Sequence, residues 1–552
     1  MALSAVVVIP ARDEERRIAG CLEALARQTV GGVGFETIVV LDACSDDTAG
    51  VVAEASAALG LRVSVLEGPG EGAGAARRAG MDAACTRLLD LGLSDGLIAC
   101  TDADSRPSSD WLERQLAHVQ AGARAIAGLI ELDGDEASEL PAAVLNRRER
   151  DASARLGRIR RTEPEAGHHH FAGASLGVTA GTYREVGGIE PLVALEDAGF
   201  AARLTEHGVP ILRASDVKVM TSARAEGRAV RGLSIDLAVS TWFECRRYRA
   251  DQFDARRLRE AKGEAGVTVI VPTKDCAETI GGVLRSTVAP LGAQGLVDEL
   301  IVVDAGSGDG TAEIAATAGA RVLQQDELLA ELGPAQGKGD AMWRGLQASG
   351  GEIVAFLDGD TADPSPSHLL GLLGPLLSDP SLRLVKGAFE RPLQAGSLTL
   401  LNEGGRVTEL MARPLINLHE PLLAGFAQPL AGEFAATREL LESISFPVGY
   451  GVEIAVLIDA LRSCGLPALA ECHLGTRQNR HQPLRALGEM AYAVLVAVEN
   501  RLSDRPARLA GQYVRPWQDG ESAAVPVQER PPIAQQANRE RQRLKAASAR
   551  SR

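Results

Sequence analysis

The sequence has 552 residues and a formal net charge of −15, and 45% of its residues are hydrophobic. A chain of this length exceeds what one hydrophobic core usually supports, so we expect at least two domains. The acidic balance argues against a general nucleic-acid-binding protein, because the binding face of such a protein needs a surplus of basic residues.

The chain begins with a predicted strand, in which an apolar run ends at Pro10. This start lacks the basic segment of a signal peptide, and no stretch of the chain reaches the roughly 18 uninterrupted apolar residues of a membrane span. The cysteines are scattered and form no C-x-x-C pair, which is typical of reduced thiols. We therefore expect a cytoplasmic protein without a membrane span.

Three sequence blocks occur twice along the chain, in the same order in each half. Each block is an apolar strand followed by polar residues and a helical pattern, and strands of this kind that alternate with helices predict a doubly wound, mostly parallel α/β sheet. The sequence therefore predicts a tandem duplication of one α/β unit. The paired blocks are AVVVIPARDEE (5–15) with VTVIVPTKDCAE (267–278), 36–48 with 298–311, and 96–107 with 352–364.

Changes in composition predict the boundaries of the two halves. The first domain covers residues 1–244, and a charged helical linker covers 245–265. The second domain covers 266–512. The last segment, 513–552, is rich in Pro, Gln, Arg and Ser and has little apolar material to bury, so it is predicted to be a disordered tail.

An aspartate pair follows the third predicted strand of each half: Asp102 with Asp104, and Asp358 with Asp360. Ligands of such sheets bind at the carboxyl ends of the strands, and two carboxylates there suit a hard cation such as Mg²⁺ or Mn²⁺. An ion between these carboxylates and a diphosphate would offset the charge that develops on a departing nucleoside diphosphate. The alternative is that the aspartates cap a following helix.

Two further motifs lie at predicted strand ends or helix starts. Asp42 and Asp304, the latter with Ser307, end the second strand of each half and could accept hydrogen bonds from a base or from ribose hydroxyls, although alone they are ordinary turn residues. Glycines flank Lys338, which lets the backbone approach a phosphate while the lysine supplies positive charge. The first half keeps the glycines, in residues 72–77, and lacks the lysine.

With these motifs, both halves resemble the GT-A fold of nucleotide-diphospho-sugar glycosyltransferases. The second half, from about 266 to 500, resembles the narrower glucosyl-3-phosphoglycerate synthase family. That family transfers glucose from a nucleotide donor to 3-phosphoglycerate with retention of configuration, and it uses Mg²⁺ or a similar ion. The matching segments are VDELIVVDAGSGDGTAE, GKGDAMWR, VAFLDGDTADP, LVKGAFERP, GGRVTELMARPL, QPLAGEFAATRELL and FPVGYGVEI.

The resemblance implies roles for individual residues of the second half. The nucleotide-sugar donor is contacted by Pro272, Glu278, Asp304, Ser307, Lys338 and Asp358, and the metal by Asp360. The acceptor-phosphate loop consists of Gly405, Arg406, Val407 and Thr408. Tyr450 and Glu453 are the catalytic candidates at the sugar and the acceptor. By analogy, the first half binds its donor with Pro10, Glu14, Asp42 and Asp102 and its metal with Asp104.

Elementary chemistry supports some of these assignments and offers alternatives for others. A guanidinium such as that of Arg406 can bind a phosphate through two parallel hydrogen bonds, whereas the alternative is a solvated arginine at a helix start. Glu433 and Glu453 could instead be acidic residues that the dipole favours at helix starts.

One block departs from the family pattern. The metal-binding histidine of the family lies in RAHRNRPL, where this chain reads RQNRHQPL over 477–484. The histidine position therefore holds Asn479, and His481 stands two residues later. Either His481 reaches the metal from there, or the ion keeps water at that position.

The first half resembles the broad family-2 glycosyltransferases over roughly residues 3–235. In that family a Glu-Asp pair supplies the general base of an inverting attack, which makes Asp197 the candidate. A neighbouring carboxylate raises the pKa of a carboxyl group, which suits a base. His168, His169 and His170 suggest zinc, but adjacent histidines cannot all face one ion, which favours a polar acceptor loop.

Three alternatives compete with this interpretation. A nucleotidyltransferase would need a GxGTRxxP-type start, which neither half has. The first half could have lost catalysis and serve as a docking or regulatory domain. The second half could be a mannosyl-transferring relative that uses GDP-mannose, since no residue separates uracil from guanine. The expected partners are a nucleotide-sugar donor and a phosphoglycerate acceptor, and the sequence is compatible with a homodimer.

Overall fold

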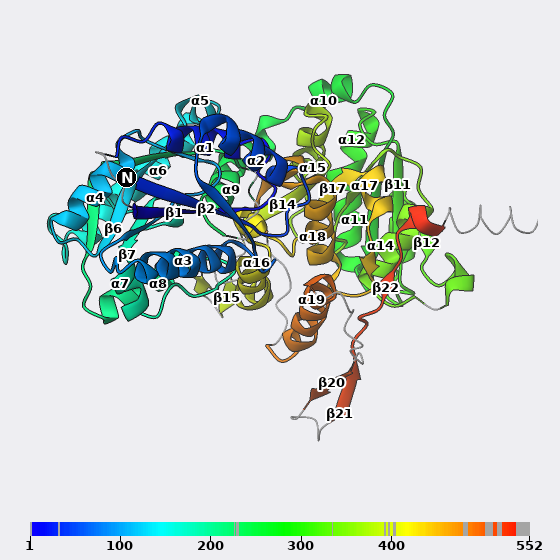
Figure 1. The fold of residues 1–552 in the computed structure, drawn as a ribbon. Coiled ribbons are helices and arrows are strands. Elements are labelled where there is room, and N and C mark those ends of the chain that lie inside the picture. Colours follow the sequence, from blue (N-terminus) through cyan, green and yellow to red (C-terminus); the bar gives the residue numbers. More distant parts are fainter. Residues whose placement is uncertain are drawn as a thin grey trace, which may run out of the picture. The chain divides into compact units, whose positions relative to one another are not determined.

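The structure is a computed structural model that describes residues 3–30, 34–225, 227, 231–333, 335–390, 393–395, 398–400, 405–477, 484–502, 512–515 and 521–536. The chain divides into two compact units, Met1–Thr241 and Trp242–Arg552. Each unit has its own eight-stranded sheet (Figure 1).

The sheet of the first unit has the strand order β3-β2-β1-β4-β7-β6-β8-β5. β1 is parallel to β2 and β4, whereas β7 is antiparallel to both of its neighbours. The strands are β1 Leu3–Ala11, β2 Gly34–Leu41, β3 Val63–Glu67, β4 Leu97–Cys100, β5 Ser105–Pro107, β6 Ala125–Leu132, β7 Leu176–Thr179 and β8 Ile211–Thr221. The helices are α1 Ile18–Ala26, α2 Thr48–Leu59, α3 Ala73–Asp90, α4 Trp111–Gln120, α5 Gly134–Ser138, α6 Ala142–Ile159, α7 Ala180–Glu185 and α8 Glu196–Glu206, and α9 Leu233–Cys245 crosses the boundary.

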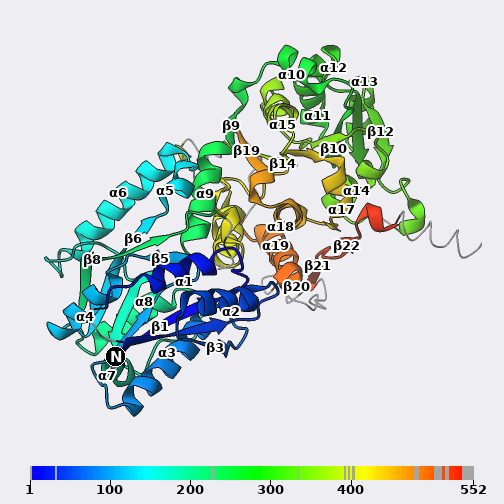
Figure 2. The same cartoon turned by 45° about the horizontal axis from the view of Figure 1, so that its top comes forward.

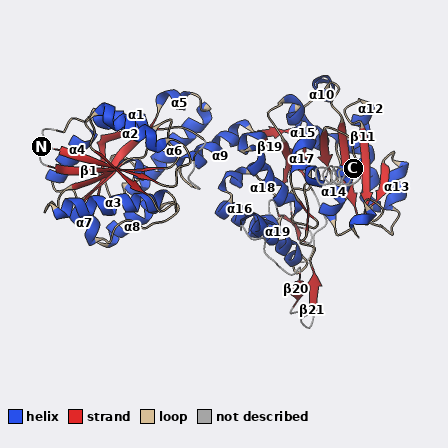
Figure 3. Ribbon diagram, turned by 45° about the vertical axis from the view of Figure 1, so that its right-hand side comes forward, coloured by secondary structure: helices blue, strands red, loops and turns tan. Residues whose placement is uncertain are grey.

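Helices cover both faces of this sheet, which explains why its central strands are apolar throughout. Successive side chains of a strand point to opposite faces. Val6 and Val8 pack with residues of α3, α7 and α8, and Val7 and Ile9 pack with residues of α1 and α4. Figure 3 shows α1, α2 and α4 on one face and α3, α7 and α8 on the other.

The second unit repeats this topology with the strand order β12-β11-β10-β13-β17-β14-β19-β9. The strands are β9 Arg247–Arg249, β10 Val267–Thr273, β11 Glu299–Asp304, β12 Arg321–Gln324, β13 Ile353–Phe356, β14 Leu384–Glu390, β15 Leu393–Ala395, β16 Leu398–Leu400, β17 Phe434–Thr437, β18 Phe446–Pro447, β19 Leu469–Thr476, β20 Gln512–Arg515, β21 Glu521–Ala524 and β22 Glu529–Arg530. The helices are α10 Ala255–Lys262, α11 Ala277–Val283, α12 Ala289–Ala293, α13 Thr311–Thr317, α14 Lys338–Gln347, α15 Pro366–Ser378, α16 Arg413–His419, α17 Arg438–Ser443, α18 Val452–Cys464 and α19 Leu487–Leu502.

The two sheets match strand for strand over seven positions, from β3 and β12 at one end to β8 and β19 near the other. β17, like β7, is antiparallel to both neighbours. The predicted fold class, two mostly parallel α/β sheets, is confirmed, and the antiparallel strand adds a detail that the sequence pattern did not indicate.

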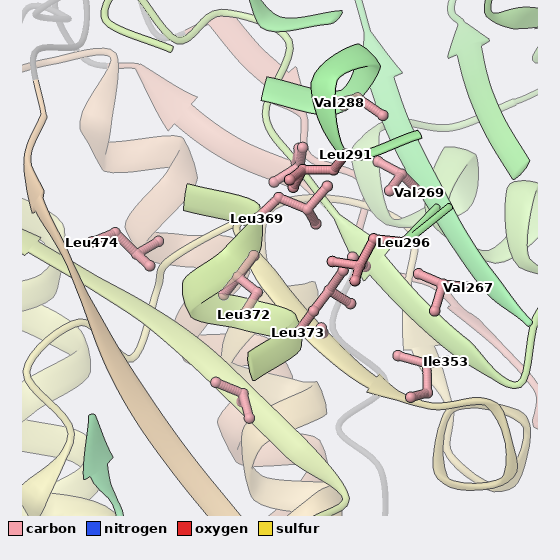
Figure 4. Close-up of a cluster of buried hydrophobic side chains, with 14 of the residues drawn as sticks. Val267, Val269, Val288, Leu291, Leu296, Ile353, Leu369, Leu372, Leu373 and Leu474 are labelled. Carbon is pink, nitrogen blue, oxygen red and sulfur yellow. The ribbon is translucent and has the colours of Figure 1, made fainter. Parts of the chain in front are cut away.

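The core of the second unit lies mainly between its sheet and α15. Val267 and Val269 of β10 belong to one buried cluster with Leu369, Leu372 and Leu373 of α15. Figure 4 shows these side chains close together, with α12 contributing at one edge. Burying a side chain of this size contributes roughly 1.5–3 kcal/mol, so this cluster holds the strand ends that carry the site in fixed positions.

The segment that we predicted to be a linker is part of the second unit. Arg247–Arg249 of β9 pair with β19, and Leu258 of α10 belongs to the same core cluster as α15. The predicted disorder of 513–552 does not extend to its described parts. β20 pairs with β21, and β22 pairs with β18. The rest of that segment lies outside the described residues.

No helix within the described ranges is long and apolar enough to cross a membrane. The eight cysteines all lie among the described residues, and each is a free thiol.

Candidate active site

A cavity of about 640 Å³ opens in the second unit, and most of the site residues predicted for this unit line it. It lies at the carboxyl ends of β10 and β13, where ligands of doubly wound sheets bind. The predicted residues in its lining are Pro272, Lys338, Asp358, Asp360, Gly405, Arg406, Val407, Thr408, Tyr450 and Glu453.

Lys338 is the cation at the centre of this cavity. Its Nζ lies 2.7 Å from Oδ1 of Asp358 and 2.8 Å from Oε1 of Glu453. Burial opposes the charge on Lys338, but the two carboxylates outweigh burial, and its pKa lies above the ordinary value. Gly432 leaves room for this pair, because a Cβ there would lie 2.3 Å from Nζ. The ammonium group is therefore charged and fixed.

Arg477 is a second buried cation beside the aspartate pair. Its Nη2 lies 3.3 Å from Oδ2 of Asp358 and 3.7 Å from Oδ1 of Asp360. Its Nη1 lies 2.8 Å from Oε1 of Glu433, whose other carboxylate oxygen is buried without a hydrogen-bond partner among the described residues. Burial raises the pKa of Glu433, although Arg477 opposes this shift.

The aspartate pair has the chemistry of a site for a divalent cation. Burial and the charge of Asp358 raise the pKa of Asp360, which means that they disfavour its ionised form. A cation bound beside this carboxylate would stabilise that ionised form. The aspartate pair offers carboxylate oxygens, which are the ligands that Mg²⁺ and Mn²⁺ prefer. Asp360 and Asp358 thus fit the predicted metal.

The predicted acceptor loop forms the start of a helical segment that continues into α16. Gly405 has a φ of 72°, which favours glycine, and its carbonyl accepts a hydrogen bond from the backbone N–H of Glu409 at 3.0 Å. Arg406 and Thr408 follow and line the cavity. Tyr450 is 48% exposed, whereas Glu453, in the first turn of α18, is buried.

Three of the predicted donor-binding residues are not in the cavity wall. Asp304 is buried and accepts hydrogen bonds from the backbone N–H and the hydroxyl of Ser307, at 3.0 and 2.6 Å. These two residues therefore shape the turn after β11, and Ala305 between them lines the cavity. Glu278 is exposed in the first turn of α11. His481 and Asn479 lie outside the described residues, so their roles stay predictions.

The first unit has the same arrangement with a different cation. Arg77, which is buried on α3, donates from Nε to Oε1 of Glu196 at 3.1 Å and from Nη2 to Oδ1 of Asp102 at 3.1 Å. Burial opposes its charge, but Asp102 and Glu196 outweigh burial and its pKa lies above the ordinary value. A Cβ at Gly173 would lie 2.2 Å from the guanidinium carbon. Arg77 thus takes the place of the lysine that the first half lacks.

The other predicted residues of the first unit lie at three places. Asp104 lies 2.9 Å from Nη2 of Arg224, which also pairs with Glu14. Asp42 accepts hydrogen bonds at 2.7 and 2.9 Å from the backbone N–H groups of Gly70 and Gly72, so it holds the loop before α3. Pro10 is half-buried near the end of β1.

Asp197 is the half-buried member of the predicted Glu-Asp pair. It is the second residue of α8 and accepts a hydrogen bond from the N–H of Ala198 at 2.7 Å, whereas Glu196 accepts a hydrogen bond from Arg77. His168 does not fit a zinc site, because both of its ring nitrogens already contact backbone groups. Its Nε2 contacts the carbonyls of Ala127 and Ala214 at 3.2 and 3.3 Å, and its Nδ1 accepts a hydrogen bond from the N–H of His170 at 3.1 Å.

Sequence reasoning missed Arg224 and Arg477 as partners of the aspartate pairs. Each lies within three residues of the end of the corresponding strand, β8 or β19. Their shared place after the last long strand of each half was the signal that could have found them.

The model of glycosyl transferase family 2 matches residues 6–178 and 268–387. The chain belongs to glycosyl transferase family 2. It is therefore a glycosyltransferase, and the GT-A fold that the resemblance implied is confirmed.

Several relatives are glucosyl-3-phosphoglycerate synthases. That of Mycolicibacterium paratuberculosis is 42% identical over 303 residues, which are 53% of this chain and 91% of the relative. That of Petrotoga mobilis is 36% identical over 290 residues, 50% of this chain and 88% of the relative. Each relative therefore corresponds to about half of this chain.

Solved structures with similar sequences include two enzymes that act on phosphoglycerate. Mannosyl-3-phosphoglycerate synthase from Rubrobacter xylanophilus is 42% identical, with a TM-score of 0.48, and covers 53% of this chain and 97% of its own. Glucosyl-3-phosphoglycerate synthase from Mycobacterium tuberculosis, in complex with Mn²⁺, UDP-glucose and phosphoglyceric acid, is 39% identical, with a TM-score of 0.47, and covers 51% of this chain and 95% of its own.

Proposed function

We propose that the second unit transfers glucose from UDP-glucose to 3-phosphoglycerate with Mg²⁺ or Mn²⁺ as cofactor. The observation that carries this proposal is the cavity that combines Lys338, the aspartate pair and the loop of Arg406. Its size suits a nucleotide sugar, since ligand pockets usually measure about 300–1,000 Å³. The named relatives, at 36–42% identity, support glucose as the sugar and phosphoglycerate as the acceptor.

Different residues of the cavity bind the donor and the acceptor. The ammonium group of Lys338 offsets negative charge on the diphosphate, and it is held in place by Asp358 and Glu453. Arg406 binds the phosphate of the acceptor through charge-assisted hydrogen bonds. When bound at Asp358 and Asp360, the cation supplies further positive charge to the leaving group.

The transfer breaks the bond between the anomeric carbon and the diphosphate oxygen and forms one between that carbon and the acceptor oxygen. UDP leaves with the electron pair of the broken bond, and its departing diphosphate oxygen takes the proton that the acceptor hydroxyl loses. With positive charge fixed on the diphosphate side and Arg406 on the acceptor side, the two substrates meet over Tyr450 and Glu453.

The full chain should be assayed with UDP-glucose and GDP-mannose, each with and without 3-phosphoglycerate, in the presence of Mn²⁺. Glucosyl-3-phosphoglycerate should form from UDP-glucose, with an α-linkage that NMR would detect. Formation of a mannosyl product alone would replace this proposal by the mannosyl-transferring alternative.

We propose in addition that the first unit carries out a second glycosyl transfer, with inversion and with Asp197 as general base. The observation in favour is Arg77, because it supplies the cation whose absence from the sequence motif had left room for a docking domain. Asp197→Asn should abolish this transfer and leave that of the second unit intact. A first unit that binds no nucleotide sugar would favour the docking-domain alternative.

A further inference from the structure

The segment near the C-terminus, Glu521–Gln536, contacts the helix that carries Lys338. We call it the C-terminal strap. In Figures 1 and 2, β22 of this strap lies beside α14. Nε1 of Trp343 on α14 donates to the carbonyl of Pro531 at 3.1 Å, which fixes the strap to the side of the helix.

Arg530 of the strap forms a bidentate pair with a buried aspartate of α14. Its Nε lies 2.8 Å from Oδ1 of Asp340, and its Nη2 lies 2.9 Å from Oδ2. Asp340 is fully buried, and burial opposes its ionisation. Arg530 and Arg344 nevertheless lower its pKa, so the pair is charged on both sides. A bidentate pair fixes direction as well as distance.

Asp340 connects this pair to the start of α14. Its Oδ2 also accepts a hydrogen bond from the N–H of Gln336 at 3.1 Å, and its own N–H donates to the carbonyl of Val448 at 3.1 Å. Lys338 lies between Gln336 and Asp340, as the first residue of the helix. The backbone on both sides of the lysine is therefore tied to Asp340.

The strap also contributes to the cavity wall. Val525 and Pro526 line the cavity. The N–H of Val448 donates to the carbonyl of Gln528 at 2.9 Å, and a Cβ at Gly449 would lie 2.6 Å from the carbonyl oxygen of Pro526. The loop before Tyr450 thus packs directly on the strap.

A second ion pair fixes the strap on its other side. Arg501 of α19 lies 2.9 Å from Oε1 of Glu529 and 2.6 Å from Oδ2 of Asp459 on α18. The strap is therefore held by α14 and by α19, and Arg530 makes its charged contact with the lysine helix.

We propose that Arg530 is a positioning residue for the donor site, which acts through Asp340 on the orientation of Lys338. This inference rests on the proposed function of the second unit. The strap thereby completes a site whose charged residues all come from earlier in the chain. Loss of Arg530 leaves the buried Asp340 with Arg344 as its one remaining charged partner among the described residues and lets the start of α14 turn away from the diphosphate.

The test is steady-state kinetics of the full chain with UDP-glucose, 3-phosphoglycerate and Mn²⁺. Arg530→Met should raise the KM for UDP-glucose by about 10- to 100-fold, the range expected for a misplaced binding group, while the KM for 3-phosphoglycerate changes less than about twofold. Arg530→Lys, which keeps one charge contact, should recover part of the loss. Arg256→Met is the matched control, because Arg256 is exposed on α10 and pairs only with Glu260 among the ion pairs of the described residues.

A merely structural role predicts a different result. Arg530→Met would then lower Tm and the amount of active enzyme, and so kcat, with both KM values unchanged, and this outcome would overturn the inference. If Arg530→Met does not fold, the kinetics of Arg530→Lys test the inference. An unchanged KM for UDP-glucose in that variant overturns the inference, and a rise of this KM without a rise of the KM for 3-phosphoglycerate supports it. A parent chain without transfer to 3-phosphoglycerate would overturn the proposed function and the inference together.

Discussion

Arg77 of the first unit and Lys338 of the second make the same two contacts, although they stand at different positions of their helices. Arg77 is the fifth residue of α3 and Lys338 the first of α14. Each bridges the first aspartate of the D-x-D pair and a glutamate in the first turn of a later helix. The longer arginine side chain reaches the same carboxylates from one turn farther along its helix.

The first prediction concerns Lys338. Lys338→Met should lower kcat/KM for transfer to 3-phosphoglycerate by about 100-fold or more, since it removes a fixed positive group from the leaving diphosphate. The measurement is a coupled assay of UDP release. Arg249→Met, at an exposed ion pair with Asp251, should leave the rate unchanged. Equal losses in both variants would contradict a specific role of the lysine.

The second prediction concerns the metal. Asp360→Ala should reduce transfer to 3-phosphoglycerate to background and weaken Mn²⁺ binding measured by calorimetry, because a carboxylate ligand is lost. Asp363→Ala removes an exposed aspartate from the same loop and serves as the control. Transfer that persists in Asp360→Ala would show that Asp360 is not an essential ligand, and transfer by the parent in excess chelator would show that no metal is needed.

The third prediction concerns the acceptor. Arg406→Ala should raise the KM for 3-phosphoglycerate by tens to hundreds of fold, because losing a charge-assisted pair costs roughly 2–4 kcal/mol. The KM for UDP-glucose should change little. Arg413→Ala is the comparison, because Arg413 lies on the same helical segment and pairs with Glu409. A rise in the donor KM instead would assign Arg406 to the diphosphate.

The fourth prediction concerns pH and Lys386, which is fully buried and donates to the carbonyl of Ala431 at 2.6 Å. Burial lowers its pKa to about 7. In the unfolded chain the lysine keeps its proton up to about pH 10.4, so the unfolded state binds more protons above pH 7 and stability rises with pH.

Between pH 7 and 8.5 the free energy of unfolding should therefore gain up to about 1.4 kcal/mol per pH unit from this residue. Calorimetry of Lys386→Met should show a smaller rise of Tm over this range than the parent does. Lys218→Met, at an exposed lysine, should behave as the parent. Identical pH dependence in Lys386→Met and the parent would mean that this lysine does not titrate in the window.

The fifth prediction concerns the boundary. A fragment of residues 242–552 should fold with a higher Tm than one of residues 266–552, because the shorter fragment loses β9 and α10. β9 completes the sheet beside β19, and Leu258 of α10 is buried in the core cluster. Calorimetry of both fragments is the measurement. Equal Tm values would mean that residues 242–265 act as the linker that composition suggested.

The sequence by itself determined the duplication, the two α/β sheets and the aspartate pairs at the strand ends. These features depend on short-range patterns: apolar runs form the buried strands, and the polar residues that follow lie at one edge of the sheet. The motifs also singled out Lys338 and Asp358 separately, and the structure then brings them 2.7 Å apart.

Only the tertiary structure decided which residues complete the sites. Arg77 meets Glu196 across 119 residues of sequence, and Arg530 meets Asp340 across 190. Contacts of this kind depend on how strands and helices far apart in the chain are packed, and no local pattern encodes that geometry. For the same reason the strap composed of polar residues and proline looked disordered in the sequence: its order comes from the groups on α14 and α19 to which it binds.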